Sequence, residues 1–269
     1  MLRVRACGMS DVGVIRSHNE DCFDIDPDQR MYVVADGMGG HSHGEIASRI
    51  AVEAIREFVS KTADKDSTWP FAGDPKLSRN ANRLREAIRV AHERVLRAIR
   101  QDGALHGMGT TVVGILLDGD AIAVAHVGDS RAYRYRNGQL ELLTQDHTWV
   151  NEQVVAGFLS EEQARVHPLK NVVTRALGGD SEVLVDVKEW RVSDGDLFLL
   201  CSDGLTTMLS DPEIVERLRS SERLEEVCGR LVRDANARGG YDNVSVVLLK
   251  VEEASDDDGD DTATSQIPR

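Results

Sequence analysis

The stretch M-Y-V-V-A-D-G-M-G-G-H, residues 31–41, joins an apolar run to a glycine-rich turn through a single acid. Residues 31–35 have the length and β-branched content of a strand that is buried on both faces. Asp36 then lies where the strand reaches the surface, and three glycines in the next four positions let the backbone turn sharply and approach a ligand closely. A carboxylate beside bare backbone suits a hard cation. Alternatively, the stretch is only a strand-to-helix turn, with Asp36 capping the helix that follows.

Length and composition favour one domain followed by a tail. The chain has 269 residues, of which 41% are hydrophobic, enough for one large core or two small ones. Its interior contains no long linker, so we expect a single domain over residues 1–251. Residues 252–269 carry seven acids against one arginine, together with Gly, Ser and Thr. Such a composition predicts a disordered acidic tail.

The charge and the cysteines exclude several classes of function. The formal net charge is −14, and an acidic body lacks the basic face that sequence-independent nucleic-acid binding needs. The four cysteines are scattered without a C-x-x-C pair, which indicates a reducing cytoplasm rather than a disulfide framework. The N-terminus lacks the apolar region of a signal peptide, and no run approaches the ~20 apolar residues of a membrane span. We expect a cytoplasmic monomer that binds neither nucleic acid nor membranes.

The periodicity of apolar residues predicts a layered α/β fold. Helices are expected at residues 44–59, 81–99, 211–218 and 224–237. Strands are expected at residues 9–15, 22–26, 31–35, 112–117, 121–127, 132–136, 139–143, 182–190, 197–201 and 244–251. Hairpin signals such as Asn137-Gly138 make the sheets largely antiparallel. Two helices come early and two late, so we expect two packed sheets with a helical layer outside each, a four-layer α-β-β-α sandwich.

Acids recur where these strands begin and end. Three apolar runs end at Asp36, Asp129 and Asp203, and two begin just after Glu20-Asp21 and Asp242. In an antiparallel sheet the exit of one strand lies beside the entrance of its neighbour, so these acids can reach one rim, within a few ångströms of each other. Carboxylates so close raise each other's pKa and destabilise the fold unless cations bind them.

The chemistry of such a rim points to metal-assisted attack on phosphorus. Oxygen-only ligands favour Mg²⁺ or Mn²⁺ over Zn²⁺. A pair of such ions makes a bridging water acidic enough to attack phosphorus. Arg16, near Glu20, offers a rigid fork that can hold two phosphate oxygens. Taken singly, each residue has a plainer interpretation: Arg16 as a surface ion pair, and Asp129 and Asp203 as turn residues beside glycine.

Six short motifs follow one another along the chain: R16-S-H-N-E-D21, D36-G-M-G-G-H41, G107-M-G-T-T111, V127-G-D-S-R131, S202-D-G-L205 and G240-Y-D-N-V244. In this order they resemble the motifs of the metal-dependent protein Ser/Thr phosphatases, the protein phosphatase 2C (PPM) family, in its compact bacterial form. The resemblance covers residues 5–251. No single motif is decisive, but six in register are highly specific. The family fold is an α-β-β-α sandwich, which matches the layers expected above.

The resemblance implies two catalytic Mn²⁺ or Mg²⁺ ions. Asp36 would bridge both ions, and the Gly37 carbonyl would bind the second. Asp203 and Asp242 would bind the first ion. Glu20 would hold the second, in part through water. The family mechanism is direct attack by a metal-bridging hydroxide, without a phosphoenzyme, and no cysteine of this chain lies in a phosphate-cradling loop.

The resemblance also implies supporting roles. Asp129, together with Asp203, would serve a third, weaker ion. Arg16 would bind the substrate phosphate. Asp21 would lie behind the ligands, and Asn243 would orient Asp242.

Two positions depart from the family pattern. Many eukaryotic members have a histidine two positions after the bridging aspartate, proposed as a general acid, whereas this chain has Met38. His41 is a substitute candidate, although its side chain could instead support the turn. Some members also have an acid where this chain has Thr207, so a third ion would rest on Asp129, Asp203 and water.

The resemblance predicts a phosphoprotein phosphatase that acts on phosphoserine and phosphothreonine and opposes a bacterial Ser/Thr kinase. One alternative is a catalytically silent binding module, which usually lacks one or more metal ligands. Another keeps the chemistry but directs it at a phosphorylated regulatory partner such as an anti-sigma antagonist. Residues 144–179, which begin T-Q-D-H-T, resemble the flap of the bacterial members and are expected to shape substrate entry.

Overall fold

The computed structural model describes residues 2–39, 43–64, 73–219, 223–253 and 264–267. The strands are β1 (Leu2–Asp11), β2 (Asp21–Asp26), β3 (Met31–Met38), β4 (Gly109–Thr110), β5 (Val112–Asp118), β6 (Ala121–Val127), β7 (Arg131–Arg136), β8 (Gln139–Leu142), β9 (Asp186–Arg191), β10 (Leu197–Cys201), β11 (Val244–Glu253) and β12 (Thr264–Ile267). The helices are α1 (His43–Lys61), α2 (Arg79–Gln101), α3 (Trp149–Val155), α4 (Glu161–Val166), α5 (Asp203–Thr206), α6 (Asp211–Leu218) and α7 (Leu224–Ala237).

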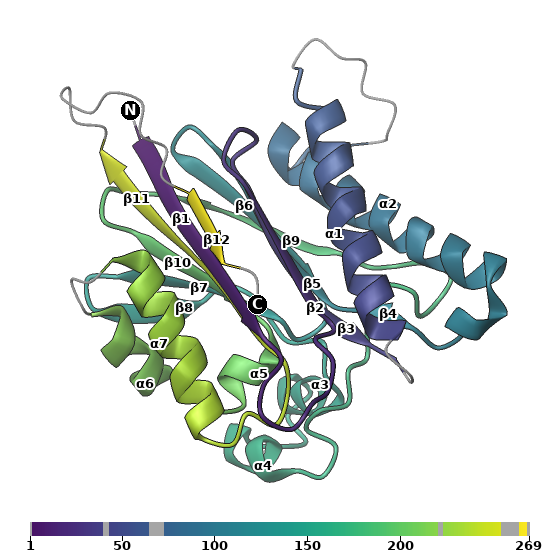
Figure 1. Ribbon diagram of the computed structural model, residues 1–269. Helices are drawn as coiled ribbons and strands as arrows, with labels where there is room; N and C mark the ends of the chain where they lie inside the picture. The colour runs from purple at the N-terminus through teal and green to yellow at the C-terminus, as the bar shows by residue number, and fades with distance from the viewer. Residues whose placement is uncertain (1, 40–42, 65–72, 220–222, 254–263, 268–269) are drawn as a thin grey trace.

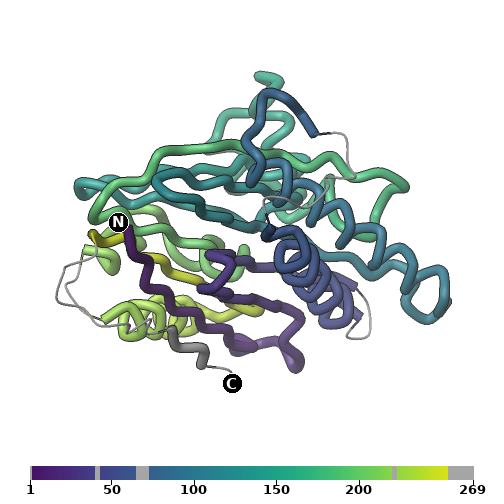
Figure 2. Tube along the Cα trace, turned by 90° about the horizontal axis from the view of Figure 1, so that it is seen from above, coloured from purple at the N-terminus to yellow at the C-terminus, as the bar shows by residue number. Residues whose placement is uncertain are grey.

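The strands form two sheets. The first has the order β12-β1-β11-β10-β7-β8, and the second has the order β2-β3-β5-β6-β9, with β4 paired to β3. Neighbouring strands run antiparallel, except that β12 runs parallel to β1. Asn137 and Gly138 both have positive φ, which is the geometry of the hairpin turn that their sequence predicts. Strands β1 and β11, from opposite ends of the chain, lie side by side (Figures 1 and 2).

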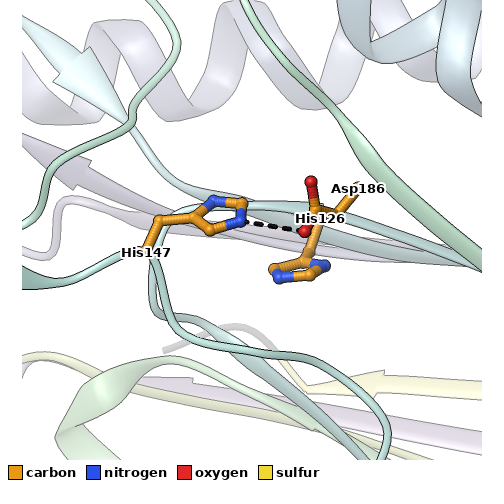
Figure 3. Close-up of side chains that lie close together, drawn as sticks. All are labelled: His126, His147 and Asp186. Carbon is orange, nitrogen blue, oxygen red and sulfur yellow. Dashed lines mark ion pairs between the residues drawn. The ribbon is translucent and has the colours of Figure 1, made fainter. Parts of the chain in front are cut away.

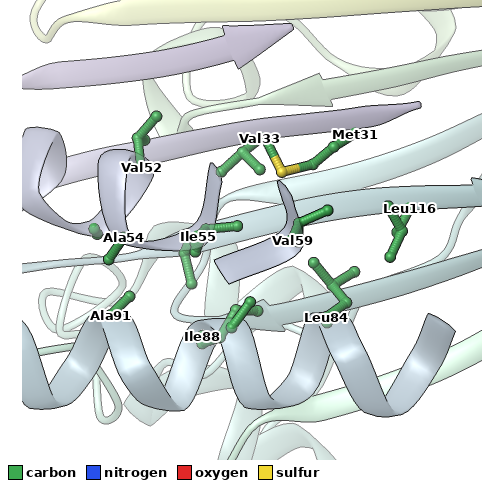
Figure 4. Packing of buried hydrophobic residues seen from close by; sticks show 14 of the residues in the cluster. Met31, Val33, Val52, Ala54, Ile55, Val59, Leu84, Ile88, Ala91 and Leu116 are labelled. Atoms are coloured by element: carbon green, nitrogen blue, oxygen red, sulfur yellow. The ribbon is translucent and has the colours of Figure 1, made fainter. Parts of the chain in front are cut away.

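Helices cover the outer face of each sheet (Figure 1). Helices α1 and α2 pack Ile55, Val59, Leu84 and Ile88 against Val33 and its neighbours on the second sheet (Figure 4). Helices α6 and α7 bury their apolar sides against the first sheet. These helices form at the predicted places because their apolar residues recur at spacings of three and four and meet a sheet face.

A third apolar cluster fills the space between the sheets. Phe198, Leu200 and Val247 of the first sheet meet Val34 and Ile115 of the second. The four layers are therefore helix, sheet, sheet and helix, as predicted. No helix among the described residues is both long and apolar enough to span a bilayer.

The structure differs from the sequence prediction at both ends of the chain and at the start of β9. The first strand is Leu2–Asp11 rather than residues 9–15, and β9 begins at Asp186 rather than at residue 182. In β1, apolar residues alternate with arginines, and Arg5 is held by Glu252 on β11. Disorder was expected from residue 252 onward, but β11 continues to Glu253, and Thr264–Ile267 is a strand beside β1. Residues 254–263 lie outside the described part of the chain.

Candidate active site

Asp36 lies near the end of β3, directly opposite Asp21 on β2. Its N–H donates to Thr111 Oγ1 at 3.1 Å, and its carbonyl accepts the Thr111 N–H at 2.9 Å and the Thr110 hydroxyl at 2.9 Å. The Thr111 hydroxyl in turn lies 2.7 Å from the Ser130 hydroxyl, beside Asp129. The backbone of Asp36 is therefore fixed on both sides, and its carboxyl group is hydrogen-bonded to that of Asp203.

Gly37 allows the loop before β2 to close onto α1. A Cβ atom at Gly37 would lie 2.2 Å from the Gly44 carbonyl oxygen and 2.4 Å from that of Glu20, which no side chain can satisfy. The Gly37 N–H and the Ser48 hydroxyl both donate to the Glu20 carbonyl, at 3.1 and 2.6 Å. The Gly44 N–H donates to Glu20 Oε1 at 3.2 Å. Among the described residues, Glu20 rather than Asp36 therefore serves the N-terminal turn of α1.

Asp203 and Asp242 come from the first sheet. Asp203 follows β10 as the first residue of α5, and Asp242 precedes β11. Arg16 Nη2 donates to Asp242 Oδ2 at 2.7 Å, and both side chains are partly exposed. The sequence thus correctly places Arg16 beside the acids, where in this structure it makes an ion pair.

Asn243 organises the loop that carries Arg16 and Glu20. Its side-chain NH₂ donates to the carbonyls of Val12 and His18, both at 2.9 Å. Its Oδ1 accepts the Glu20 N–H at 2.8 Å, and its own N–H donates to Asp242 Oδ1 at 2.9 Å. The contact with Asp242 agrees with the predicted orienting role, but it comes from the backbone, while the buried side chain fixes the loop.

Hydroxyl groups support the acids, and the sequence interpretation did not assign them. The Ser202 hydroxyl donates to Asp21 Oδ2 at 2.7 Å and accepts the Ser245 N–H at 2.9 Å. Thr111 stands within the quoted G-M-G-T-T motif, and Ser202 and Ser130 directly flank metal-ligand candidates. Their positions in the motifs were the available signal.

The acids share one end of the molecule and repel one another. Burial, followed by the charges of Asp21, Asp203, Asp129 and Asp242, raises the pKa of Asp36 well above its ordinary value. Burial and the neighbouring acids also raise the pKa of Asp21 and of Asp129 to about 7 and that of Asp203 to about 6. Asp21 Oδ1 is buried without a hydrogen-bond partner. A set of oxygen donors with an excess of negative charge fits hard divalent cations such as Mn²⁺ and Mg²⁺.

The rim is wider than the sequence predicts. Among the residues that the structure describes, the trio whose possible ligand atoms all lie within 4.8 Å of one another is His126, His147 and Asp186, and no trio of the rim acids meets this distance. A pair of ions about 4 Å apart needs a wider ligand set than one ion does, because only a bridging residue touches both.

The two positions that depart from the family pattern lie at the edge of this site. Met38 ends β3, is partly buried and pairs with Gly109 of β4. Thr207 follows α5, and its N–H donates to the Asp203 carbonyl at 2.8 Å. His41, the substitute candidate for a general acid, lies outside the described residues.

The loop between β1 and β2, helix α5 and the flap helices α3 and α4 lie at the same end of the sandwich (Figure 1). Asp21 and Asp36 belong to the second sheet, whereas Asp203 and Asp242 flank strands of the first. Asp129 lies between β6 of the second sheet and β7 of the first. The acids therefore gather at the seam between the two sheets, where a set of oxygen donors fits divalent cations.

Comparisons with known proteins agree with this architecture. The family profile of protein phosphatase 2C matches residues 16–243. The Ser/Thr phosphatase Stp of Listeria monocytogenes is 36% identical over 249 residues, covering 90% of this chain and 93% of that protein. The Ser/Thr protein phosphatase PstP of Mycobacterium tuberculosis is 37% identical over 251 residues, covering 93% of this chain and 45% of that protein.

Solved structures give the same result. The crystal structure of M. tuberculosis PstP matches with a TM-score of 0.83 and 34% identity, covering 94% of this chain and all of that one. The catalytic domain of a Ser/Thr protein phosphatase PstP in complex with two manganese ions matches with a TM-score of 0.80 and 34% identity, covering 94% of this chain and all of that one. The chain belongs to the protein phosphatase 2C family and is a metal-dependent protein Ser/Thr phosphatase.

Proposed function

We propose that the rim acids of this chain hold two catalytic divalent cations, Mn²⁺ or Mg²⁺. Asp36 would serve both ions, Asp203 and Asp242 would hold the first, and Glu20 and the Gly37 carbonyl would hold the second. Asp129 and Asp203 would serve a third, weaker ion. The observation that carries this assignment is the group of acids whose pKa values burial and mutual repulsion raise. When bound, the cations lower the pKa of water and offset the charge that develops on the phosphate.

We further propose that Arg16 binds the substrate phosphate. Its guanidinium is half-exposed, so that it can reach solvent while it remains in contact with Asp242. A phosphate that enters the site competes with the Asp242 carboxylate for the same fork of N–H donors. In this way the chain itself orients the phosphorus atom toward the acids.

The reaction proposed is direct hydrolysis of phosphoserine and phosphothreonine in proteins, by attack of water on phosphorus. A cysteine nucleophile is disfavoured, because burial raises the pKa of the Cys22 thiol, next to Asp21, to about 11. Burial also raises the pKa of the Cys201 thiol, next to Ser202, to about 12. Neither group supplies a thiolate at neutral pH.

The partners proposed are cytoplasmic phosphoproteins, namely a Ser/Thr kinase or its substrates, and the protein is proposed to act as a monomer. A phosphorylated regulatory partner would be recognised by the same site, since these residues read the phosphate rather than the protein that bears it. A silent binding module is disfavoured because each candidate ligand is present in the sequence.

Turnover of p-nitrophenyl phosphate and of a phosphothreonine peptide, with and without Mn²⁺, tests the proposal. We expect Asp36→Asn and Asp203→Asn each to lower kcat by a factor on the order of 100 or more, because each removes a cation ligand. Asp28→Asn, on an exposed turn, is the matched control and should behave like the original protein. Full activity of either ligand variant would refute the metal assignment, and circular dichroism would establish that the variants are folded.

A further inference from the structure

The T-Q-D-H-T motif at residues 144–148 contains none of the proposed ligands, yet it holds the segment on both sides of Asp129. The carbonyl of Gln145 lies 2.8 Å from His126 Nε2. The carboxylate of Asp146 accepts three hydrogen bonds from Arg131, the shortest at 2.7 Å. Gly128, which lies between His126 and Arg131 and directly before Asp129, is bound by His147.

The contact between His147 and Gly128 is made in both directions. The Gly128 N–H donates to His147 Nδ1 at 3.1 Å, and the His147 N–H donates to the Gly128 carbonyl at 3.0 Å. A nitrogen that accepts a hydrogen bond carries no proton, so the neutral imidazole has its proton on Nε2. That nitrogen faces Asp186 Oδ2 at 3.3 Å (Figure 3). Burial lowers the pKa of His147, which keeps the ring neutral.

This tautomer argues against a metal ion at His126, His147 and Asp186, although their possible ligand atoms lie within 4.8 Å of one another. His147 Nε2 bears the proton and so has no lone pair to offer. The guanidinium of Arg175 already supplies positive charge there: its Nη1 lies 3.3 Å from Asp186 Oδ1 and 3.2 Å from His147 Nε2. The rings of His126 and His147 also stack, with centroids 4.7 Å apart. The trio is therefore an anchoring cluster.

The anchor also reaches the returning part of the flap. The Thr174 N–H donates to the His147 carbonyl at 2.8 Å, and the Trp149 N–H donates to the Val172 carbonyl at 2.9 Å. On the other side, Gly128 has a φ of +103°, and a Cβ there would lie 2.6 Å from the Thr111 side chain. The backbone before Asp129 thus has little room to move, and the Gly128 N–H is held by His147.

We propose that His147 is a positioning residue that sets the place of Asp129 through the Gly128 N–H and ties it to the flap. The proposal rests on the proposed role of Asp129 as a cation ligand. The loss of this contact frees the Gly128–Asp129 backbone and weakens cation binding, while the remaining ligands and Arg16 stay in place.

Two variants of similar size separate this role from simple packing. The Oδ1 atom of His147→Asn can occupy the place of Nδ1 and accept the Gly128 N–H, but it does not reach Asp186. His147→Gln extends toward Asp186 and does not offer an acceptor at the Nδ1 position. His106→Ala, which changes an exposed histidine on a turn after α2, is the control. For each variant, kcat and KM for p-nitrophenyl phosphate are measured across a Mn²⁺ titration, together with the melting temperature.

We expect His147→Gln to raise the Mn²⁺ concentration for half-maximal activity by about tenfold, the scale of a lost ligand support, with KM little changed. His147→Asn should restore the titration to within about threefold of the original. An unchanged titration for His147→Gln, or equal impairment of both variants in step with their melting temperatures, overturns the proposal. Asp129→Asn is measured in parallel. If it leaves the Mn²⁺ titration unchanged, the proposed ligand role of Asp129 fails; if it shifts the titration while His147→Gln does not, only the positioning role fails.

Discussion

Arg16 is the residue of the site that faces both the acids and the solvent. Its guanidinium has five N–H donors on one rigid plane, and in the described structure only Nη2 donates to Asp242. A lysine would keep the charge but lose the fork. The geometry of the donors, rather than the charge alone, is therefore what this position contributes to phosphate binding.

We expect Arg16→Lys to raise KM for p-nitrophenyl phosphate by about tenfold, with a smaller effect on kcat, because one of two parallel hydrogen bonds to the phosphate is lost. Steady-state kinetics at saturating Mn²⁺ measures this. Arg97→Lys, an exposed arginine on α2, provides the control. A fall in kcat with KM unchanged would show that Arg16 acts on the reacting bond instead.

At the element scale, the flap is held by its caps more than by its core. Helices α3 and α4 have seven and six residues, and the only buried residue in either is Val150 of α3. Thr148 caps α3, and Ser160 with Gln163 forms a capping box at α4. Phe158, between the two helices, and Val166, the last residue of α4, are 77% and 83% exposed. Apolar side chains so exposed near a phosphate site suit contact with a protein substrate.

We expect Phe158→Ser to raise KM for a phosphothreonine peptide by about three- to tenfold, the effect of about 1 kcal/mol of lost apolar contact, and to leave p-nitrophenyl phosphate unaffected. Leu142→Ser, on the exposed edge strand β8, should change neither. Equal effects of Phe158→Ser on both substrates would contradict a recognition role for the flap.

The sequence predicted helices and strands well where the apolar residues recurred at a single regular spacing. Helices α6 and α7 have the predicted bounds, and α1 and α2 are each one or two residues longer at both ends. Strand β1 was largely missed because its arginines hide the alternation. The rim acids followed from their places at strand ends, whereas the hydroxyls of Thr111 and Ser202 did not. Hydroxyl residues are common in strands, and their partners depend on which strands meet.

At the scale of the whole molecule, the acids make stability depend on pH. Their pKa values in the folded state lie near 6 to 7, above the ordinary value of 3.8. Between about pH 4 and pH 7 the folded protein therefore holds more protons than the unfolded chain. The free energy of unfolding that these groups contribute is fully present below pH 4 and is lost as pH rises through 7.

We expect the metal-free protein, kept in a chelator, to lose stability from pH 5 to pH 8, because Asp129 and its neighbours must then carry charge. Asp129→Asn should show a smaller loss, since one titrating group is gone. Urea unfolding at the two pH values measures both, and Mn²⁺ should restore the stability at pH 8 by binding the charged form. A loss of equal size in the two proteins would contradict the raised pKa of Asp129.

The proposed ligands come from different sheets: Asp36 lies on the second, whereas Asp203 and Asp242 flank strands of the first. An ion bound between them would link the two sheets, so its affinity would depend on how the sheets are placed relative to each other. Coupling between two binding sites is reciprocal: if the ion changes the affinity for a partner that shifts one sheet against the other, that partner changes the affinity for the ion by the same factor. A protein that binds only the outer helices could thus regulate catalysis allosterically, without contacting the phosphate.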